Sequence, residues 1–209
     1  MRKGFTILVA LLLIGAATTV GAQQADMGNG LSVQLGFYMP KDSEVKDVVG
    51  SNWLSLGLNY RVAATETVEH LVSLGYIRAS GKTTDLGSTY IPGYGNVDIS
   101  MEVKGSLIPL TYTYKTRPSA DQKFYFGGGG GLYFSKTTLT ATGGGVSESV
   151  DTTDTKPAIH ILAGVNLSDK FMAEVRYTHF LSKSKIIEYQ GESADADLSG
   201  LSFSLGASF

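Results

Sequence analysis

The residues best suited to chemistry in this sequence are its three histidines, because a histidine beside a serine can activate the hydroxyl as a nucleophile. They are His70, His160 and His179. His179 is the strongest candidate, since Ser182 and Ser184 follow it closely, but Phe180 and Leu181 intervene. No cluster of His, Cys, Asp or Glu has the spacing of metal ligands. We therefore expect no catalytic residue, no metal site and no cofactor.

A second set of ionisable residues lies in segments whose alternate positions carry large apolar side chains. It consists of Arg61, Lys115, His160, Glu174 and Arg176. Charged groups of both signs on the protected side of such segments can form a desolvated ion-pair network. They can also line a path for protons or ions. Which of these holds depends on the elements that position them.

The elements are predicted by an alternation of apolar and small or polar residues, which is the period of a β-strand. In the last segment, Leu201, Phe203 and Leu205 alternate with serines and a glycine. Eight segments follow this pattern: 31–38, 52–61, 70–80, 107–115, 123–136, 158–167, 170–178 and 198–209.

The connections between these segments are long and short in turn. The long ones are 39–51, 81–100, 141–155 and 183–197, and the short ones are 62–69, 117–122 and 168–170. A transmembrane barrel has this layout, with short periplasmic turns and long outer loops. We therefore predict an all-β, eight-stranded antiparallel up-and-down transmembrane β-barrel with both termini periplasmic. Parity alone leaves open a soluble, lipocalin-like barrel with its apolar side chains inside.

Strand direction then gives the height of the ionisable residues. Arg61, Lys115, Glu174 and Arg176 are expected in the periplasmic half, and His160 nearer the outer end. A barrel of eight strands is just wide enough for its side chains to fill the interior. We therefore favour an ion-pair network that plugs the lumen over a proton or ion path.

The segment from Lys123 to Lys136 places five consecutive glycines, Gly127 to Gly131, between aromatic residues. Phe124 and Phe134 share parity and are separated by about 33 Å of strand, or about 25 Å along the membrane normal after tilting. That is the height of the apolar band between two aromatic girdles. Glycine inside a strand often marks a bend or a close approach, so we expect a sharply curved wall here. The alternative is a flexible linker.

The first 22 residues have the composition of a secretory signal peptide. Arg2 and Lys3 precede an apolar run, and small residues occupy the end of the segment, Val20 to Ala22. Cleavage would leave residues 23–209 as one domain and take the formal charge from −2 to −4. That charge argues against nucleic acid as a partner.

The sequence resembles the small outer-membrane β-barrel proteins of Gram-negative bacteria, the OmpA-like and opacity-protein-like surface antigens. The resemblance rests on "FYFGGGGGLYF", on "LIPLTYTYK" before it, on "MAEVRYTHF" after it, and on the terminal Phe209. It implies an outer-membrane location and eight strands. It also implies that Phe209 is an assembly signal for the barrel-assembly machinery. Tyr112, Tyr114, Phe124 and Phe134 are expected in the membrane girdles.

The resemblance implies no single function, because the group is heterogeneous. We expect a structural or surface-interaction role, adhesin-like or antigen-like, with no enzymatic activity. The expected partners are outer-membrane lipid, lipopolysaccharide and an extracellular surface ligand held by the long connections. One alternative is the transport of small apolar molecules through a gap at the glycine strand. A second is a lipid A-modifying hydrolase built around His179, although the His-x-Ser spacing of the barrel deacylases is absent.

Overall fold

A ring of eight antiparallel strands forms the body of the protein in a computed structural model that describes residues 30–79, 81–93, 95–189 and 192–209. The predicted signal peptide lies outside the described residues. The ring strands are β1 (Leu31–Pro40), β2 (Trp53–Ala64), β3 (Val68–Ala79), β5 (Gly95–Thr116), β6 (Phe124–Gly143), β7 (Val146–Asn166), β8 (Phe171–Phe180) and β11 (Gly200–Ser208).

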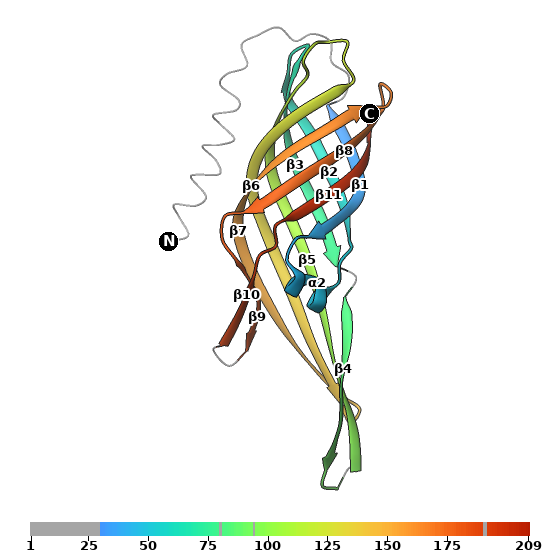
Figure 1. Ribbon diagram of the computed structural model, residues 1–209, viewed down its shortest axis with the longest axis vertical. Coiled ribbons are helices and arrows are strands. Elements are labelled where there is room, and N and C mark those ends of the chain that lie inside the picture. The colour runs from blue at the N-terminus through green and yellow to red at the C-terminus, as the bar shows by residue number, and fades with distance from the viewer. Residues whose placement is uncertain (1–29, 80, 94, 190–191) are drawn as a thin grey trace.

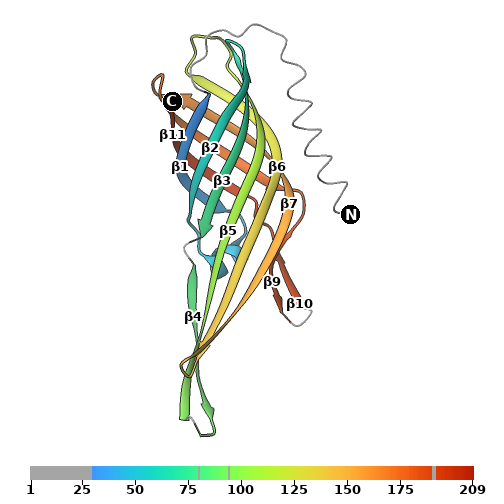
Figure 2. The same cartoon turned by 180° about the vertical axis from the view of Figure 1, so that it is seen from behind.

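The ring closes because pairing runs from each strand to its neighbour and returns to the start. The sheet order β3-β2-β1-β11-β8-β7-β6-β5 is joined end to end by antiparallel pairing of β3 with β5 (Figures 1 and 2). The predicted eight-stranded up-and-down barrel is thereby confirmed. None of the helices among the described residues is long and apolar enough to cross a membrane.

The apolar side chains face outward. On β1, Leu35 and Phe37 are exposed, whereas Gln34 before them and Tyr38 after them are buried. On β11, Leu201, Phe203 and Leu205 are likewise exposed. A soluble protein would instead bury its large apolar side chains and expose its polar ones. The alternative of a soluble barrel with an apolar interior is therefore wrong.

The two ends of the barrel differ in construction. At the turn end, the strands are joined by the links 65–67, 117–123 and 167–170, and Phe209 lies there as well. At the hairpin end, the structure corrects our expectation of four loops. The segment 39–51 holds the helix α2 (Ser43–Val49), and the segment 81–100 holds β4 (Lys82–Ile91) and the start of β5.

The other two expected loops are also ordered. Most of 141–155 continues β6 and β7, with Gly144 and Gly145 between them at φ of 60° and 79°. The segment 183–197 forms a separate hairpin of β9 (Ser184–Tyr189) and β10 (Glu192–Ala196). β5, β6 and β7 are 22, 20 and 21 residues long, about twice what a bilayer crossing needs. They therefore project far beyond the other ring strands (Figures 1 and 2).

Helix α2 closes over the hairpin end. Asp42 caps its first turn by accepting a hydrogen bond from the amide of Glu44 at 2.9 Å, and it also accepts one from Asp197 at 3.3 Å. Val45 and Val49 turn inward and are fully buried. They join an apolar cluster that fills this end of the barrel, which we call the apolar plug: Tyr38, Val45, Val49, Trp53, Ile77, Ala79, Val103, Leu107, Tyr133, Ala158, Phe180, Ile186, Ala196 and Leu198.

The glycine strand is ordered and paired on both sides from Phe126 to Gly143, through all five glycines, which rules out the flexible linker. Its inward glycines are required by the neighbouring backbone. A Cβ built on Gly129 would clash with the carbonyl oxygen of Tyr112, and one on Gly131 with that of Leu110. The outward Gly128 is less restricted, because its Cβ would lie 3.2 Å from the carbonyl oxygen of His160. The glycines therefore allow β6 to curve closely around β5.

Candidate functional site

A three-residue ion cluster occupies the lumen at mid-barrel. Glu174 on β8 lies between two cations, with its Oε2 2.6 Å from Lys115 Nζ and its Oε1 2.9 Å from Arg176. The Glu174 side chain is 1% exposed and the Lys115 side chain 6%. Because β5 and β8 are not neighbours in the ring, the contact between Lys115 and Glu174 crosses the lumen.

Tyr125 completes this cluster and was not among the expected residues. Its hydroxyl donates to Glu174 Oε2 at 3.2 Å, and its ring lies 4.5 Å from the Lys115 ammonium in a cation–π contact. The parity of the glycine strand contains the signal that would have found it. Tyr125 shares parity with Gly127, Gly129 and Gly131, and all four positions face inward.

The two remaining expected lumen residues lie apart from this cluster. His160 Nε2 is 2.9 Å from the Thr113 hydroxyl on the opposite side of β6, and His160 is buried. Arg61 lies 3.6 Å from Glu69, which also binds Arg117 at 2.8 Å. The sequence pattern does not predict Glu69 as a lumen residue, because it lies in the expected connection 62–69, whereas β3 begins at Val68.

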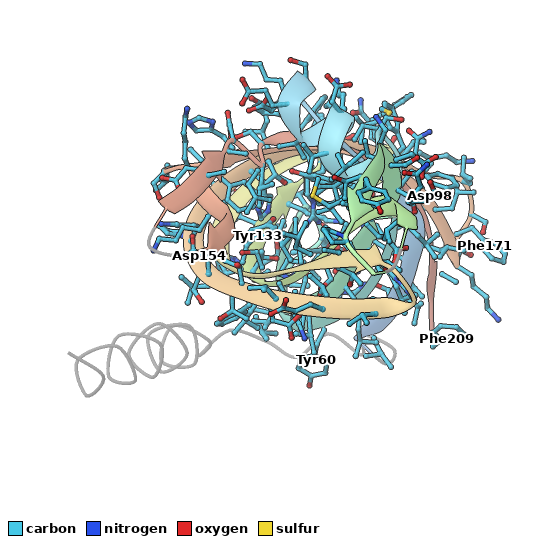
Figure 3. All side chains as sticks on the ribbon, turned by 90° about the horizontal axis from the view of Figure 1, so that it is seen from below. Tyr60, Asp98, Tyr133, Asp154, Phe171 and Phe209 are labelled. Carbon is cyan, nitrogen blue, oxygen red and sulfur yellow. The ribbon has the colours of Figure 1, made fainter. Side chains whose placement is uncertain are left out.

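Polar hollows lie on both sides of the mid-barrel cluster. A cavity of about 420 Å³ opens at the turn end, lined by Arg61, Glu69, Lys115 and Arg117 among others. A smaller one of about 50 Å³ lies deeper, lined by Gln34, Asn59, Tyr133, Glu174 and Arg176 among others. The ion cluster separates the two, and the apolar plug closes the lumen beyond the smaller hollow. Figure 3 looks along the barrel and shows Tyr133 inside the ring, with Tyr60, Phe171 and Phe209 outside it.

The histidine weighed for catalysis has a different serine partner from those the sequence suggested. His179 Nδ1 lies 3.4 Å from Ser199 Oγ, and Asp197 accepts the Ser199 amide at 2.9 Å. Ser199 is fully buried, and its Oγ accepts the amide of Phe180 at 2.9 Å. Burial opposes ionisation of Asp197, but the hydrogen bonds from Ser199 outweigh it and hold the pKa of this carboxyl below its usual value. The arrangement ties the segment just before β11 to the end of β8, and its serine is not accessible as a nucleophile.

No metal centre is formed by the part of the chain that the structure describes, since no three His, Cys, Asp or Glu side chains gather there.

The family of the chain follows from its similarity to known protein families. Residues 7–209 match the model of the outer membrane protein beta-barrel domain. The chain belongs to this family. The protein is therefore an outer-membrane β-barrel.

Several solved structures are similar to the chain at low sequence identity. The N-terminal barrel domain of Pseudomonas aeruginosa OprF is 12% identical, with a TM-score of 0.51, and the match covers 88% of this chain and 100% of that one. Ail of Yersinia pestis is 15% identical with a TM-score of 0.49, over 87% and 99% of the two chains. Neisserial surface protein A is 10% identical with a TM-score of 0.43, over 86% and 96%. No curated protein matches the chain by sequence.

The outer surface of this membrane barrel holds the aromatic residues named above for the girdles. Phe124 and Phe134 are exposed at positions ten residues apart on β6. Tyr112 and Tyr114 are exposed beside the glycines, opposite Gly130 and Gly128. His70 contacts both tyrosines, through a hydrogen bond to Tyr112 and an edge contact with Tyr114 at 5.4 Å. At the terminus, the Phe209 amide donates to Leu31 on β1 at 3.0 Å.

Proposed function

We propose that the protein is a non-conducting outer-membrane barrel whose role is structural or surface-interacting and is carried by its projecting hairpins. One observation carries this proposal: the lumen is closed twice, by the ion cluster around Glu174 and by the apolar plug under α2. A solute would have to break a buried ion pair and then cross an apolar layer. In our proposal the lumen residues serve stability, and the protein has no enzymatic activity.

The hairpin end faces the outside of the cell in this proposal, and the termini face the periplasm. Short turns at one end and long projections at the other support that orientation. Residues 1–22 are a signal peptide that is removed, which leaves residues 23–209 as the mature barrel. Phe209 serves as the signal for the barrel-assembly machinery, and the girdle aromatics contact outer-membrane lipid.

The two alternatives have less support. Lateral transport through the glycine strand needs a gap in the wall, but β6 pairs with both neighbours through all five glycines. A hydrolase needs a serine that substrate can reach, and the serine nearest His179 is fully buried. A surface role needs only the projecting strands.

Conductance tests the closed lumen. Purified full-length protein in planar bilayers should show no openings above those of a control with empty detergent. A matched variant, Val49→Asp, places a charge in the apolar plug without touching the ion cluster, and should remain silent because Glu174 still closes the lumen. Large, stable single-channel openings by the wild type would reject the proposal.

Labelling of intact cells tests the orientation. The chain has no cysteine, so single cysteines can be placed at Ser147 near the tip of the β6–β7 hairpin and at Ser119 in a turn. A membrane-impermeant thiol reagent should label position 147 in intact cells, and position 119 only after the outer membrane is opened. The reverse labelling pattern would show that the protein has the opposite orientation in the membrane.

A further inference from the structure

The outward face of the β5–β6–β7 projection is entirely polar. Direct pairing partners share a face in an antiparallel sheet, so the register aligns these strands in four ranks of three residues. We call this face the hydroxyl wall: Ser106, Lys136 and Thr153; Lys104, Thr138 and Asp151; Glu102, Thr140 and Ser149; Ser100, Thr142 and Ser147. Eight of its twelve side chains carry a hydroxyl, and none is apolar or aromatic.

The hydroxyl wall is neutral and held in place by its own contacts. Its two lysines are paired internally, Lys136 with Asp151 at 2.8 Å and Lys104 with Glu102 at 2.7 Å. Hydrogen bonds join Thr138 to Asp151 at 2.7 Å. Two further bonds, at 2.9 and 3.0 Å, join Thr140 to Ser149 and Thr142 to Ser147. Because these contacts position nine of the twelve side chains before any ligand arrives, binding would lose little rotamer freedom at those positions.

The hydroxyl wall continues directly from the face that meets lipid. The rank next to it toward the barrel is Ile108, Phe134 and Thr155, and the following one is Leu110, Leu132 and Pro157. From Ser106 to Ser100 the polar ranks span about 20 Å along the strand, at about 3.3 Å per residue. Whatever lies immediately above the hydrocarbon next to this part of the barrel therefore contacts the hydroxyl wall.

We propose that the hydroxyl wall packs against the saccharide of lipopolysaccharide in the outer leaflet. The inference rests on the proposed orientation and names the ligand class of the projecting strands. Hydroxyls donate and accept at once, which suits the hydroxyls of a sugar chain standing on the membrane. The glycolipid is the occupant because the wall and the lipid-facing ranks are one continuous surface of the same three strands.

The chemistry of the hydroxyl wall favours a neutral saccharide over two other ligands. Phosphate is usually recognised by free arginine or lysine, but both lysines of the wall are already paired. Protein interfaces are enriched in aromatic residues, methionine and arginine at their centre, and the wall has none of these. The sugar chain therefore fits better than either the lipid A phosphates or a protein partner.

Accessibility of two neighbouring positions on β6 tests the inference. Single cysteines replace Thr140 in the hydroxyl wall and Ala141 on the opposite face at the same height, and both carry a fluorophore. The full chain is reconstituted in vesicles of phospholipid, of lipid A alone, or of lipopolysaccharide with its core saccharide. Acrylamide, a neutral quencher, then measures exposure. Protection is expected at position 140 only, and only with the core saccharide.

Three results would overturn the inference: equal protection at both positions, no protection at position 140, or full protection by lipid A alone, which would assign the contact to phosphates. Because lipopolysaccharide is present in both leaflets of these vesicles, the outcome does not depend on orientation or conductance. A wrong orientation shows in the cell labelling instead, so the two failures are distinguishable.

A triple variant provides a second, independent measurement. Thr138→Val, Thr140→Val and Thr142→Val together keep the shape of the threonines and remove three hydroxyls. The wild type should have a higher midpoint of heat unfolding in core-containing lipopolysaccharide than in lipid A, because a ligand that binds the folded state stabilises it. The variant should lose that difference and keep the lipid A value. An unchanged difference would contradict the inference, and if the variant does not fold, the cysteine pair decides.

Discussion

Glu174 is the residue on which the interior of the barrel depends. A carboxylate with a 1% exposed side chain has lost its hydration, and two cations and a tyrosine hydroxyl replace it. The attraction between buried ions roughly offsets their desolvation, but removal of one partner leaves the others unpaired at a large cost. The cluster is therefore sensitive to single substitutions even if its net contribution to stability is small.

Glu174→Gln should lower the free energy of unfolding by about 3–5 kcal/mol, because Lys115 and Arg176 would be left without their counter-charge. Urea unfolding measures this change in free energy. The folded fraction is read on a gel, from the difference in mobility between the unheated and the heated protein. Glu69→Gln is the matched control. Glu69 also bridges two cations, but its side chain is 20% exposed, so water screens part of the loss. Equal losses for the two variants would show that burial does not set the cost.

Which residues face the lumen could be predicted from the sequence, but which of them touch could not. Parity alone predicts inward faces for Arg61, Lys115, His160, Glu174 and Arg176. Contacts across a lumen join strands that are not neighbours, as β5 and β8 show. The pairing therefore depends on barrel closure and strand stagger, which a linear pattern does not specify.

At the scale of the element, the glycine strand shows how a side chain can be excluded by the backbone of its neighbour. Gly129 is inward, and a Cβ there would clash with the Tyr112 carbonyl. Gly128 is outward, and its nearest contact would be 3.2 Å away. Because the two positions are adjacent in one strand, their strand propensity is the same. A comparison of substitutions at the two positions therefore measures the effect of the close backbone approach alone.

Gly129→Ala should destabilise the barrel by about 1–3 kcal/mol, because overpacking forces the backbone to shift. Gly128→Ala should cost less, since only a small displacement of the His160 carbonyl is needed. Urea unfolding in the same lipid measures both. If Gly128→Ala proves the more harmful of the two, the curvature of β6 around β5 is not the reason for the glycines.

The projecting strands show where pattern reading fails. Outside the membrane no lipid selects an apolar face, so Thr137–Thr142 and 147–155 lack the alternation that marked the other strands. Other signals were present in the same segment. Gly144 and Gly145 form a two-residue turn, which favours a hairpin, and threonine favours strands.

At the scale of the whole molecule, polarity inverts along the barrel axis. In the membrane the outer wall is apolar and the lumen polar, whereas at the hairpin end the outward hydroxyl wall is polar and the apolar plug lies inside. On β5 the change falls at Ser106 to Ile108, where Leu107 is buried and points inward. The side chains therefore define the level at which hydrocarbon ends.

That level predicts a depth profile on β6. Single cysteines at Leu132, Phe134, Lys136 and Thr138 all lie on the outward face at successive ranks. Labelled with a fluorophore and reconstituted with lipids brominated in their acyl chains, positions 132 and 134 should be quenched strongly. Quenching should fall at 136 and be lost at 138, because hydrocarbon ends between the ranks of Phe134 and Lys136.

Tyr133 provides the control, because it faces the lumen and is buried. A cysteine there should not be quenched by the brominated lipid, although it lies at the same height as Phe134. Strong quenching at 138 would place the hydroxyl wall inside the bilayer, and quenching at 133 equal to that at 134 would mean that the strand does not present two separate faces.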